Sequence, residues 1–322
     1  MTTRTARIAT ALLGGTAALI TLAAPAAAAP SAATAGRVDV TAQRLVLDPT
    51  DRGYVGTLTA TVTNRRPTAT WVSLVVTEPA GASFTTIEPG GGCFYTRLVE
   101  NRLVIGCGGE QIEAGKSLTF RLGFHVWTTA RSYPMVANGG RIEVVPDGAA
   151  AASDATGFTT LFRSTTGSLR KPRPYVQAVD TDLGIRGSAV TLTPQPDGTL
   201  LGRMPVTVRY GNDAPTFALN VAAALPAGVQ VDHIEPQDMP SFPYGFSVPG
   251  GRFVPGEERT FDVFLRAPVG TPAGELGTGS LTVTGSYFYG ADDPQDVDPS
   301  DNTTSFPVTA AASGQSPARP AP

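Results

Sequence analysis

The stretch Thr57-Leu58-Thr59-Ala60-Thr61-Val62-Thr63 alternates threonine with an apolar residue at every step. Successive side chains of a β-strand point to opposite faces, so this pattern sends one set to a core and leaves the other in water. Threonine and valine also suit a pleated surface. We interpret the stretch as a half-buried strand of an antiparallel sheet.

The same alternation occurs elsewhere in the chain, and it predicts strands there too. The apolar sets expected to face a core are Val206, Val208 and Tyr210; Leu118, Phe120, Leu122, Phe124 and Val126; and Phe261, Val263 and Leu265. The 322 residues include 36 Gly and 28 Pro, which mark turns between such runs and argue against long helices. No window of about a dozen residues after the N-terminal region has the 3.6-residue apolar period of a helix. The chain is therefore predicted to be all-β.

Four groups of residues recur in the same order, which indicates an internal repeat. The matched groups are Asn64 to Thr68 with Asn212 to Thr216; Pro79-Ala80-Gly81 and Ile87-Glu88-Pro89 with Pro226-Ala227-Gly228 and Ile234-Glu235-Pro236; Gly115 and Thr119-Phe120 with Gly256 and Thr260-Phe261; and Ser153 to Thr156 with Ser300 to Thr303. We infer two copies, 37–163 and 174–311, joined by a linker, 164–173. Half-buried strands must pack sheet on sheet to hide their apolar faces, so the prediction is two tandem antiparallel β-sandwiches.

The N-terminal region has the order of a secretory signal peptide. Arg4 and Arg7 precede an uncharged apolar run from Ile8 to Ala23, and small residues surround Ala28. We expect cleavage after Ala28, leaving 29–36 and the tail 312–322 disordered. The predicted product is secreted and extracellular, with loose cell-wall association left open and no membrane span after cleavage. Its acidic balance, with 27 Asp and Glu against 24 Lys and Arg before cleavage, makes nucleic acid a poor partner.

The chain contains two cysteines, Cys93 and Cys107, and both lie in the first copy. Export exposes them to an oxidising environment, so we expect one disulfide between them. The alternative is a pair of free thiols. The second copy has no cysteine, and its matching segment is shorter.

These features resemble a known family. A strand ending in Asn, the Pro-Ala-Gly turn, the two cysteines, the glycine-led Thr-Phe segment and the run from Asp296 to Asn302 are similar to the conserved-repeat Ig-like domain of unknown function of bacterial surface and secreted proteins. Asp301 departs from that pattern, and in the first copy only Ser153 to Thr156 matches the family's end. The resemblance implies that the two tandem antiparallel β-sandwiches are Ig-like. It also implies a spacer, adhesion or binding role without naming a ligand.

No catalytic set is expected. The two imidazoles, His125 and His233, fall in different copies, so we predict no catalytic residue and no enzyme activity. No cofactor is expected apart from calcium, for which one acidic loop offers oxygen ligands: Asp292, Asp293, Asp296, Asp298 and Asp301. The alternative is that these residues form turns before a strand.

The aromatic residues of one proline-rich loop, Phe242, Tyr244, Phe246 and Phe253, form a candidate contact patch for a partner. The alternative is that they fold over one end of the sandwich. Trp71 is expected to be a core residue.

We therefore predict a secreted, non-enzymatic structural, adhesive or ligand-binding module at or outside the cell surface. Its partner would be an extracellular or cell-surface protein or glycan. The alternative is a secreted carbohydrate-active hydrolase, or an accessory domain pair of one. Two carboxylates facing each other across a cleft would favour that alternative.

Overall fold

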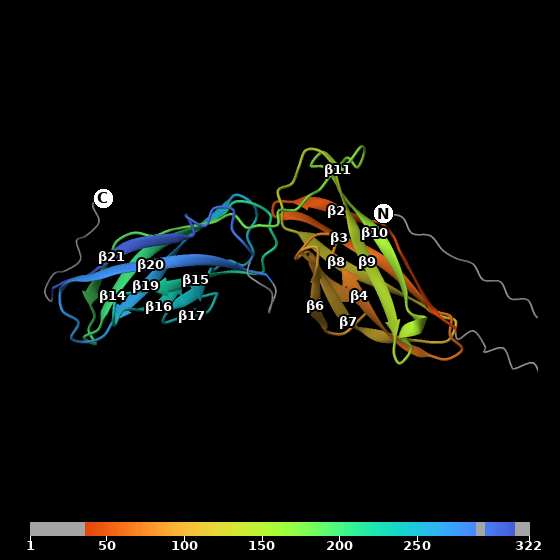
Figure 1. Cartoon of the computed structure of the whole chain (residues 1–322), viewed down its shortest axis with the longest axis horizontal. Coiled ribbons are helices and arrows are strands. Elements are labelled where there is room, and N and C mark those ends of the chain that lie inside the picture. Colours follow the sequence, from red (N-terminus) through yellow and green to blue (C-terminus); the bar gives the residue numbers. More distant parts are fainter. Residues whose placement is uncertain (1–35, 288–293, 313–322) are drawn as a thin grey trace, which may run out of the picture. The chain divides into compact units, whose positions relative to one another are not determined.

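The computed structural model describes residues 36–287 and 294–312. The expected signal peptide 1–28, most of segment 29–36 and nearly all of the tail 312–322 lie outside this range, as do Asp292 and Asp293. The described residues form 21 strands and one 3-10 turn, η1 (Ala150–Ala152), in agreement with the all-β prediction (Figure 1).

The first eleven strands form what we call sandwich 1. They are β1 (Val38–Ala42), β2 (Leu45–Thr50), β3 (Gly53–Asn64), β4 (Thr70–Thr77), β5 (Phe84–Glu88), β6 (Cys93–Val99), β7 (Arg102–Ile112), β8 (Ser117–Val126), β9 (Met135–Pro146), β10 (Asp154–Phe162) and β11 (Arg173–Pro174).

The remaining ten strands form sandwich 2. They are β12 (Leu183–Arg186), β13 (Val190–Pro194), β14 (Leu200–Tyr210), β15 (Ala218–Ala224), β16 (Gln230–Glu235), β17 (Ser241–Phe242), β18 (Gly245–Ser247), β19 (Glu257–Ala267), β20 (Gly274–Ser286) and β21 (Thr303–Ala310).

The order of strands is the same in both sandwiches. It runs β5-β8-β3-β2-β10-β9-β4-β7-β6 in the first and β16-β19-β14-β13-β21-β20-β15-β18-β17 in the second. In each, one strand crosses between the two sheets. The first residues of β2 pair in parallel with β10 and its last residues pair antiparallel with β3, and β13 does the same with β21 and β14. The chain therefore folds as two Ig-like β-sandwiches of one topology.

Two of the repeated sequence groups have a direct physical role in turns. The side-chain oxygen of Asn64 accepts a hydrogen bond from the backbone N–H of Arg66 at 2.9 Å, and Asn212 does the same with Ala214 at 3.0 Å. Asparagine favours such turns because its side chain mimics a backbone carbonyl. Gly115 and Gly256 have φ of 71° and 80°, a left-handed backbone that glycine adopts without strain.

The core of each sandwich consists of the alternating residues expected from the sequence. Leu58, Ala60 and Val62 are fully buried in sandwich 1, and Val206, Val208 and Tyr210 are buried in sandwich 2. Their neighbours Thr57 and Thr61 on β3 are exposed or half-buried. The period-two pattern thus places one face of each sheet in a common core.

One local expectation differs from the structure. Trp71 is 51% exposed, so its prediction as a core residue was wrong. On β4 its neighbours Thr70 and Val72 point inward, and alternation places Trp71 on the outer face. Part of the expected linker 164–173 is ordered, because β11 pairs in parallel with β9. Both domain boundaries remain predictions.

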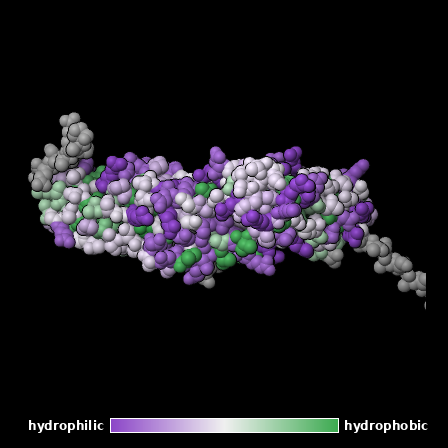
Figure 2. Space-filling view, turned by 90° about the horizontal axis from the view of Figure 1, so that it is seen from above, coloured by the Kyte–Doolittle hydropathy of each residue, from purple (hydrophilic) through white to green (hydrophobic). Residues whose placement is uncertain are grey.

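No helix in the described ranges is long and apolar enough to span a bilayer. On the face shown in Figure 2, hydrophobic residues form small groups among larger hydrophilic areas.

Replacing Leu58 with alanine should destabilise sandwich 1 by about 2 to 5 kcal/mol, because the buried side chain leaves a cavity. Both tryptophans of the chain, Trp71 and Trp127, lie in sandwich 1, so their fluorescence during urea unfolding reports on that sandwich. The matched control Thr57→Ala, on the exposed face of the same strand, should change the free energy of unfolding by less than about 0.5 kcal/mol. Equal effects of the two variants would contradict the assigned inner face.

Candidate functional site

Strand β6 lies at one margin of its sheet and is held by a hairpin with β7 (Figure 1). The turn residues Glu100 and Asn101 have φ of 49° and 59°. Two consecutive left-handed residues are the geometry of the two-residue turns that best match the twist of paired strands. The hairpin is therefore closed tightly at this end.

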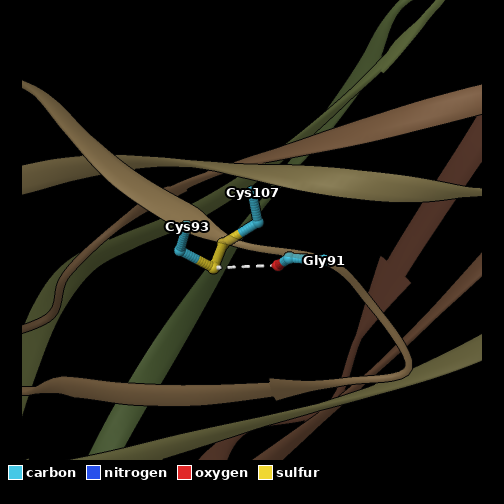
Figure 3. Close-up of a disulfide and its surroundings, with 3 residues drawn as sticks. All are labelled: Gly91, Cys93 and Cys107. Atoms are coloured by element: carbon cyan, nitrogen blue, oxygen red, sulfur yellow. Dashed lines mark hydrogen bonds between the residues drawn. A yellow bond between two sulfur atoms is a disulfide. The ribbon is translucent and has the colours of Figure 1, made fainter.

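The other end of the hairpin is closed by the disulfide between Cys93 and Cys107, which confirms the expected pairing. These two residues are directly opposite each other in the β6–β7 register. Figure 3 shows the bridge crossing between the strands, with Cys93 Sγ 3.9 Å from the carbonyl oxygen of Gly91. Cys107 is buried and Cys93 is exposed. The bond thus ties an exposed strand to a strand of the core.

Strand β6 exposes two consecutive aromatic side chains. Phe94 is 65% exposed and Tyr95 is 45% exposed. Phe94 is paired with Gly106, and its ring lies against that glycine, since a Cβ at position 106 would come within 3.1 Å of it. Tyr95 is paired with the core residue Ile105, so it extends from the inner face. The strand presents one aromatic ring on each of its faces.

Sandwich 2 exposes aromatic residues at the equivalent margin. Strands β17 and β18 occupy the places of β6 and β7 in the strand order. Phe242 on β17 is 52% exposed and Tyr244 in the adjoining turn is 74% exposed. Exposed aromatic side chains are typical of binding surfaces, because they supply large contact areas with few rotatable bonds. We call Phe94, Tyr95, Phe242 and Tyr244 the aromatic margins.

The other two aromatic residues of the expected patch are not at the surface. Phe246 and Phe253 are 3% and 4% exposed and belong to the core of sandwich 2. Phe246 packs edge-to-face on Phe261, with ring centroids 5.7 Å apart. A proline-rich loop does not show from its sequence which aromatic residues turn inward, so the expected set of four is reduced to two. A binding role for those two remains a prediction.

The described part of the acidic loop forms turns and an ion pair. Asp296 Oδ2 accepts hydrogen bonds from the Thr181 hydroxyl at 3.0 Å and the Leu183 N–H at 2.9 Å. Asp298 accepts from the hydroxyl and N–H of Ser300, and these bonds lower the pKa of Asp298. Asp301 lies 3.4 Å from Arg209. Within residues 36–287 and 294–312, no three His, Cys, Asp or Glu side chains are grouped to hold a metal ion. Calcium binding here remains a prediction.

Each histidine stacks on an aromatic ring, His125 on one just after the end of β8 and His233 on one in the neighbouring strand β19. His125 stacks on Trp127 with centroids 3.8 Å apart, and partial burial lowers its pKa. His233 stacks on Phe264 at 4.2 Å and contacts Asp232 at 2.7 Å. Neither imidazole is hydrogen-bonded to a Ser, Thr or Cys side chain among the described residues. In the described part of the chain, neither histidine therefore has the hydrogen bond that would activate a hydroxyl or thiol nucleophile.

Glu78 is a buried carboxylate that organises the end of β4. It is 1% exposed and accepts backbone N–H bonds from Phe84 at 2.7 Å, Ala82 at 2.9 Å and Leu103 at 3.1 Å. These bonds connect the Pro-Ala-Gly turn to β7. Burial raises the pKa of Glu78 to about 7, although the three N–H donors oppose the rise. The sequence reasoning did not identify this residue, since a lone Glu before a proline has the pattern of an ordinary turn.

Among known proteins, similarity to this chain was found in solved structures and not in sequences. No family model matches the chain, and no curated protein matches it. The resemblance to the conserved-repeat Ig-like family therefore remains a prediction.

Three solved structures illustrate the structural likeness. The E. coli chaperone DraB has 11% identity and a TM-score of 0.26, covering 85% of this chain and 96% of that one. The collagen adhesin CNA from S. aureus has 9% identity and a TM-score of 0.21, covering 85% and 93%. A partial N-terminal region of the enterococcal surface protein has 9% identity and a TM-score of 0.28, covering 88% and 97%. The fold assignment rests on the strand order of the chain itself.

Removing the disulfide in a Cys93→Ala, Cys107→Ala variant should lower the free energy of unfolding of sandwich 1 by about 3 kcal/mol, through the greater freedom of the unfolded chain. Amide hydrogen exchange should accelerate in β6 and remain slow in β3 and β8. Wild-type protein treated with a reducing agent should behave like the variant. If the amide groups of β6 exchange as slowly in the variant as in the wild type, the disulfide does not hold β6 in place.

The pKa of Glu78 makes the stability of sandwich 1 depend on pH. Its folded-state pKa of about 7 lies above its usual value of 4.5, so the folded state binds the Glu78 proton more tightly than the unfolded state does. The resulting contribution to the free energy of unfolding is complete below pH 4.5 and is lost as pH rises through 7. The loss should reach about 3 kcal/mol, at about 1.4 kcal/mol for each unit of the shift. Tryptophan-detected urea unfolding at several pH values measures it.

Glu78→Gln should remove this pH dependence at some cost in stability, because its amide cannot accept from all three N–H groups. Glu113→Gln, at an exposed position, should retain the wild-type slope. A wild-type slope in Glu78→Gln would assign the titration to another group.

Proposed function

We propose that the chain is exported and acts without catalysis, as a module that binds an extracellular or cell-surface macromolecule through its aromatic margins. The observation that carries the proposal is their equivalence: the same margin of the same topology exposes Phe94 and Tyr95 in one copy and Phe242 and Tyr244 in the other. Phe94, Phe242 and Tyr244 are each more than half exposed, and the occurrence of exposed aromatic residues at this margin in both copies favours contact with a partner.

The signal-peptide pattern of residues 1–28 supports export, and the disulfide suits an oxidising compartment. The resemblance to the conserved-repeat Ig-like family supports a binding or spacer role. Two margins on one chain would also let it engage two sites of a partner, which raises the apparent affinity by avidity.

The proposal is tested by the binding of the full chain to a panel of extracellular-matrix proteins, cell-wall fractions and glycans. A variant with Phe94, Tyr95, Phe242 and Tyr244 all replaced by alanine should bind its target at least about tenfold more weakly, because aromatic anchors contribute the most to interfaces. The matched control is Trp71→Ala, which removes an exposed aromatic residue away from both margins.

Two results would contradict the proposal. One is the absence of any target, or a target bound equally by the wild type and the fourfold variant. The other is release of new reducing ends from a glycan in the panel, which would favour the hydrolase alternative.

A further inference from the structure

Strand β6 is an edge strand with little protection. Its seven residues pair with β7 alone, and no backbone group of Cys93–Val99 is bonded to another strand of the described chain. An edge strand presents a row of N–H and C=O groups that can accept a further strand, and most proteins block this with prolines, charges or short strands. Strand β6 contains no proline, and its one charged residue is Arg97. One bulge between Tyr95 and Arg97 shifts its register with β7, so the strand is regular over Cys93–Tyr95 and again over Arg97–Val99.

The other three ends of the two strand orders are protected. Strand β5 has five residues and is followed by Pro89. Strand β16 carries Asp232 and Glu235 and is followed by Pro236. Strand β17 has two residues, lies between Pro240 and Pro243, and is covered where the Val231 N–H donates to the Pro243 carbonyl at 3.0 Å. Among these ends, β6 is the longest and the one without an adjoining proline.

The conformation of β6 is also fixed before any partner binds. The left-handed turn at Glu100 and Asn101 and the disulfide at Cys93 close the hairpin at both ends. A template fixed in advance loses less conformational entropy when a ligand binds. Phe94 and Tyr95 lie on opposite faces. The Phe94 ring is 65% exposed, so a segment added beside β6 would meet it on one face, whereas the Tyr95 ring already packs on Phe217 with ring centroids 5.1 Å apart.

We propose that β6 binds an extended peptide segment of a partner protein, which pairs with it as an additional strand. This inference rests on the proposed function and names the partner class of one aromatic margin. The segment would carry apolar side chains at alternate positions, to contact Phe94, and an acidic side chain opposite Arg97. Main-chain hydrogen bonds would give affinity and the side chains would give specificity.

Charge favours a foreign peptide over a second copy of this chain. Arg97 is exposed and makes no ion pair with any residue in the described ranges. The β6 sequence Cys93–Val99 contains no Asp or Glu, so a second β6 would bring a second Arg97 and no partner for the first. A glycan can stack on the aromatic rings but lacks the regular spacing of amide groups that pairs with a strand edge.

The test is selection of short linear peptides of random sequence on the immobilised full chain, followed by synthesis of an enriched peptide. The enriched peptides should alternate apolar residues and include an Asp or Glu. Binding should slow amide exchange in β6, and N-methylation of alternate peptide amides should abolish it by removing the ladder donors. A peptide with the same side chains scrambled in order is the probe's control.

Variants of the protein locate the site. Arg97→Glu should weaken binding of the enriched peptide about tenfold, since it replaces an attraction with a repulsion. The matched control Arg121→Glu makes the same charge change at an exposed position of β8 and should bind as the wild type does.

Four results would overturn the inference: no enriched peptide, binding that survives N-methylation, binding unaffected by Arg97→Glu, or β6 amides that become protected with rising protein concentration in the absence of peptide. The last would identify a second copy as the occupant. If one of these results is obtained but the wild type binds a panel target that the fourfold aromatic variant does not bind, the proposed function stands and only the strand-pairing inference fails. Absence of both kinds of binding rejects both.

Discussion

Burial of one face of every sheet is the constraint on which the rest of this structure depends. The chain has few charged residues and no long helix in its described parts, so its stability comes from apolar side chains placed at every second position of its strands. Leu58, Ala60 and Val62 of β3 are fully excluded from water, whereas the threonines between them are not. A slip of one residue would exchange the two sets, which is why the alternation also fixes the register.

The same constraint explains how far the sequence could predict the fold. Alternation and the repeated turn residues were sufficient for two sandwiches, because both are local patterns with a direct geometric meaning. Asn64 and Asn212 show this, since each makes the same turn bond in its copy. The cysteine pair was equally clear, since two cysteines allow one intramolecular bond. Trp71 was predicted wrongly because residue type was given more weight than the alternation of β4, which places it outside.

The candidate site was harder to predict because margins lack a periodic signal. In the loop of sandwich 2, Phe246 turns inward and Tyr244 outward, and nothing in Pro- and Gly-rich sequence separates them. Phe94 and Tyr95 were missed although they follow Cys93 directly. The sequence did contain a signal for them, since the matching segments of the two copies both contain aromatic residues, Phe94 and Tyr95 in one and Phe242 and Tyr244 in the other. Topology was needed to show that these segments occupy one margin.

The two copies use different means to hold that margin, and the difference has a functional consequence. In sandwich 2 the margin is short, flanked by prolines and covered by a hydrogen bond from β16, so it is held by its own backbone contacts. In sandwich 1 the strand is longer and most of its side chains are exposed, with Leu98 partly buried and Tyr95 packed on Phe217, so core packing holds it weakly. A covalent bond to β7 replaces that packing. Because the disulfide fixes the strand without covering it, β6 can stay ordered while its outer backbone groups remain free to pair. If packing held the margin instead, the contacting residues would cover the edge, and the outer N–H and C=O groups of the strand could not pair with a further strand.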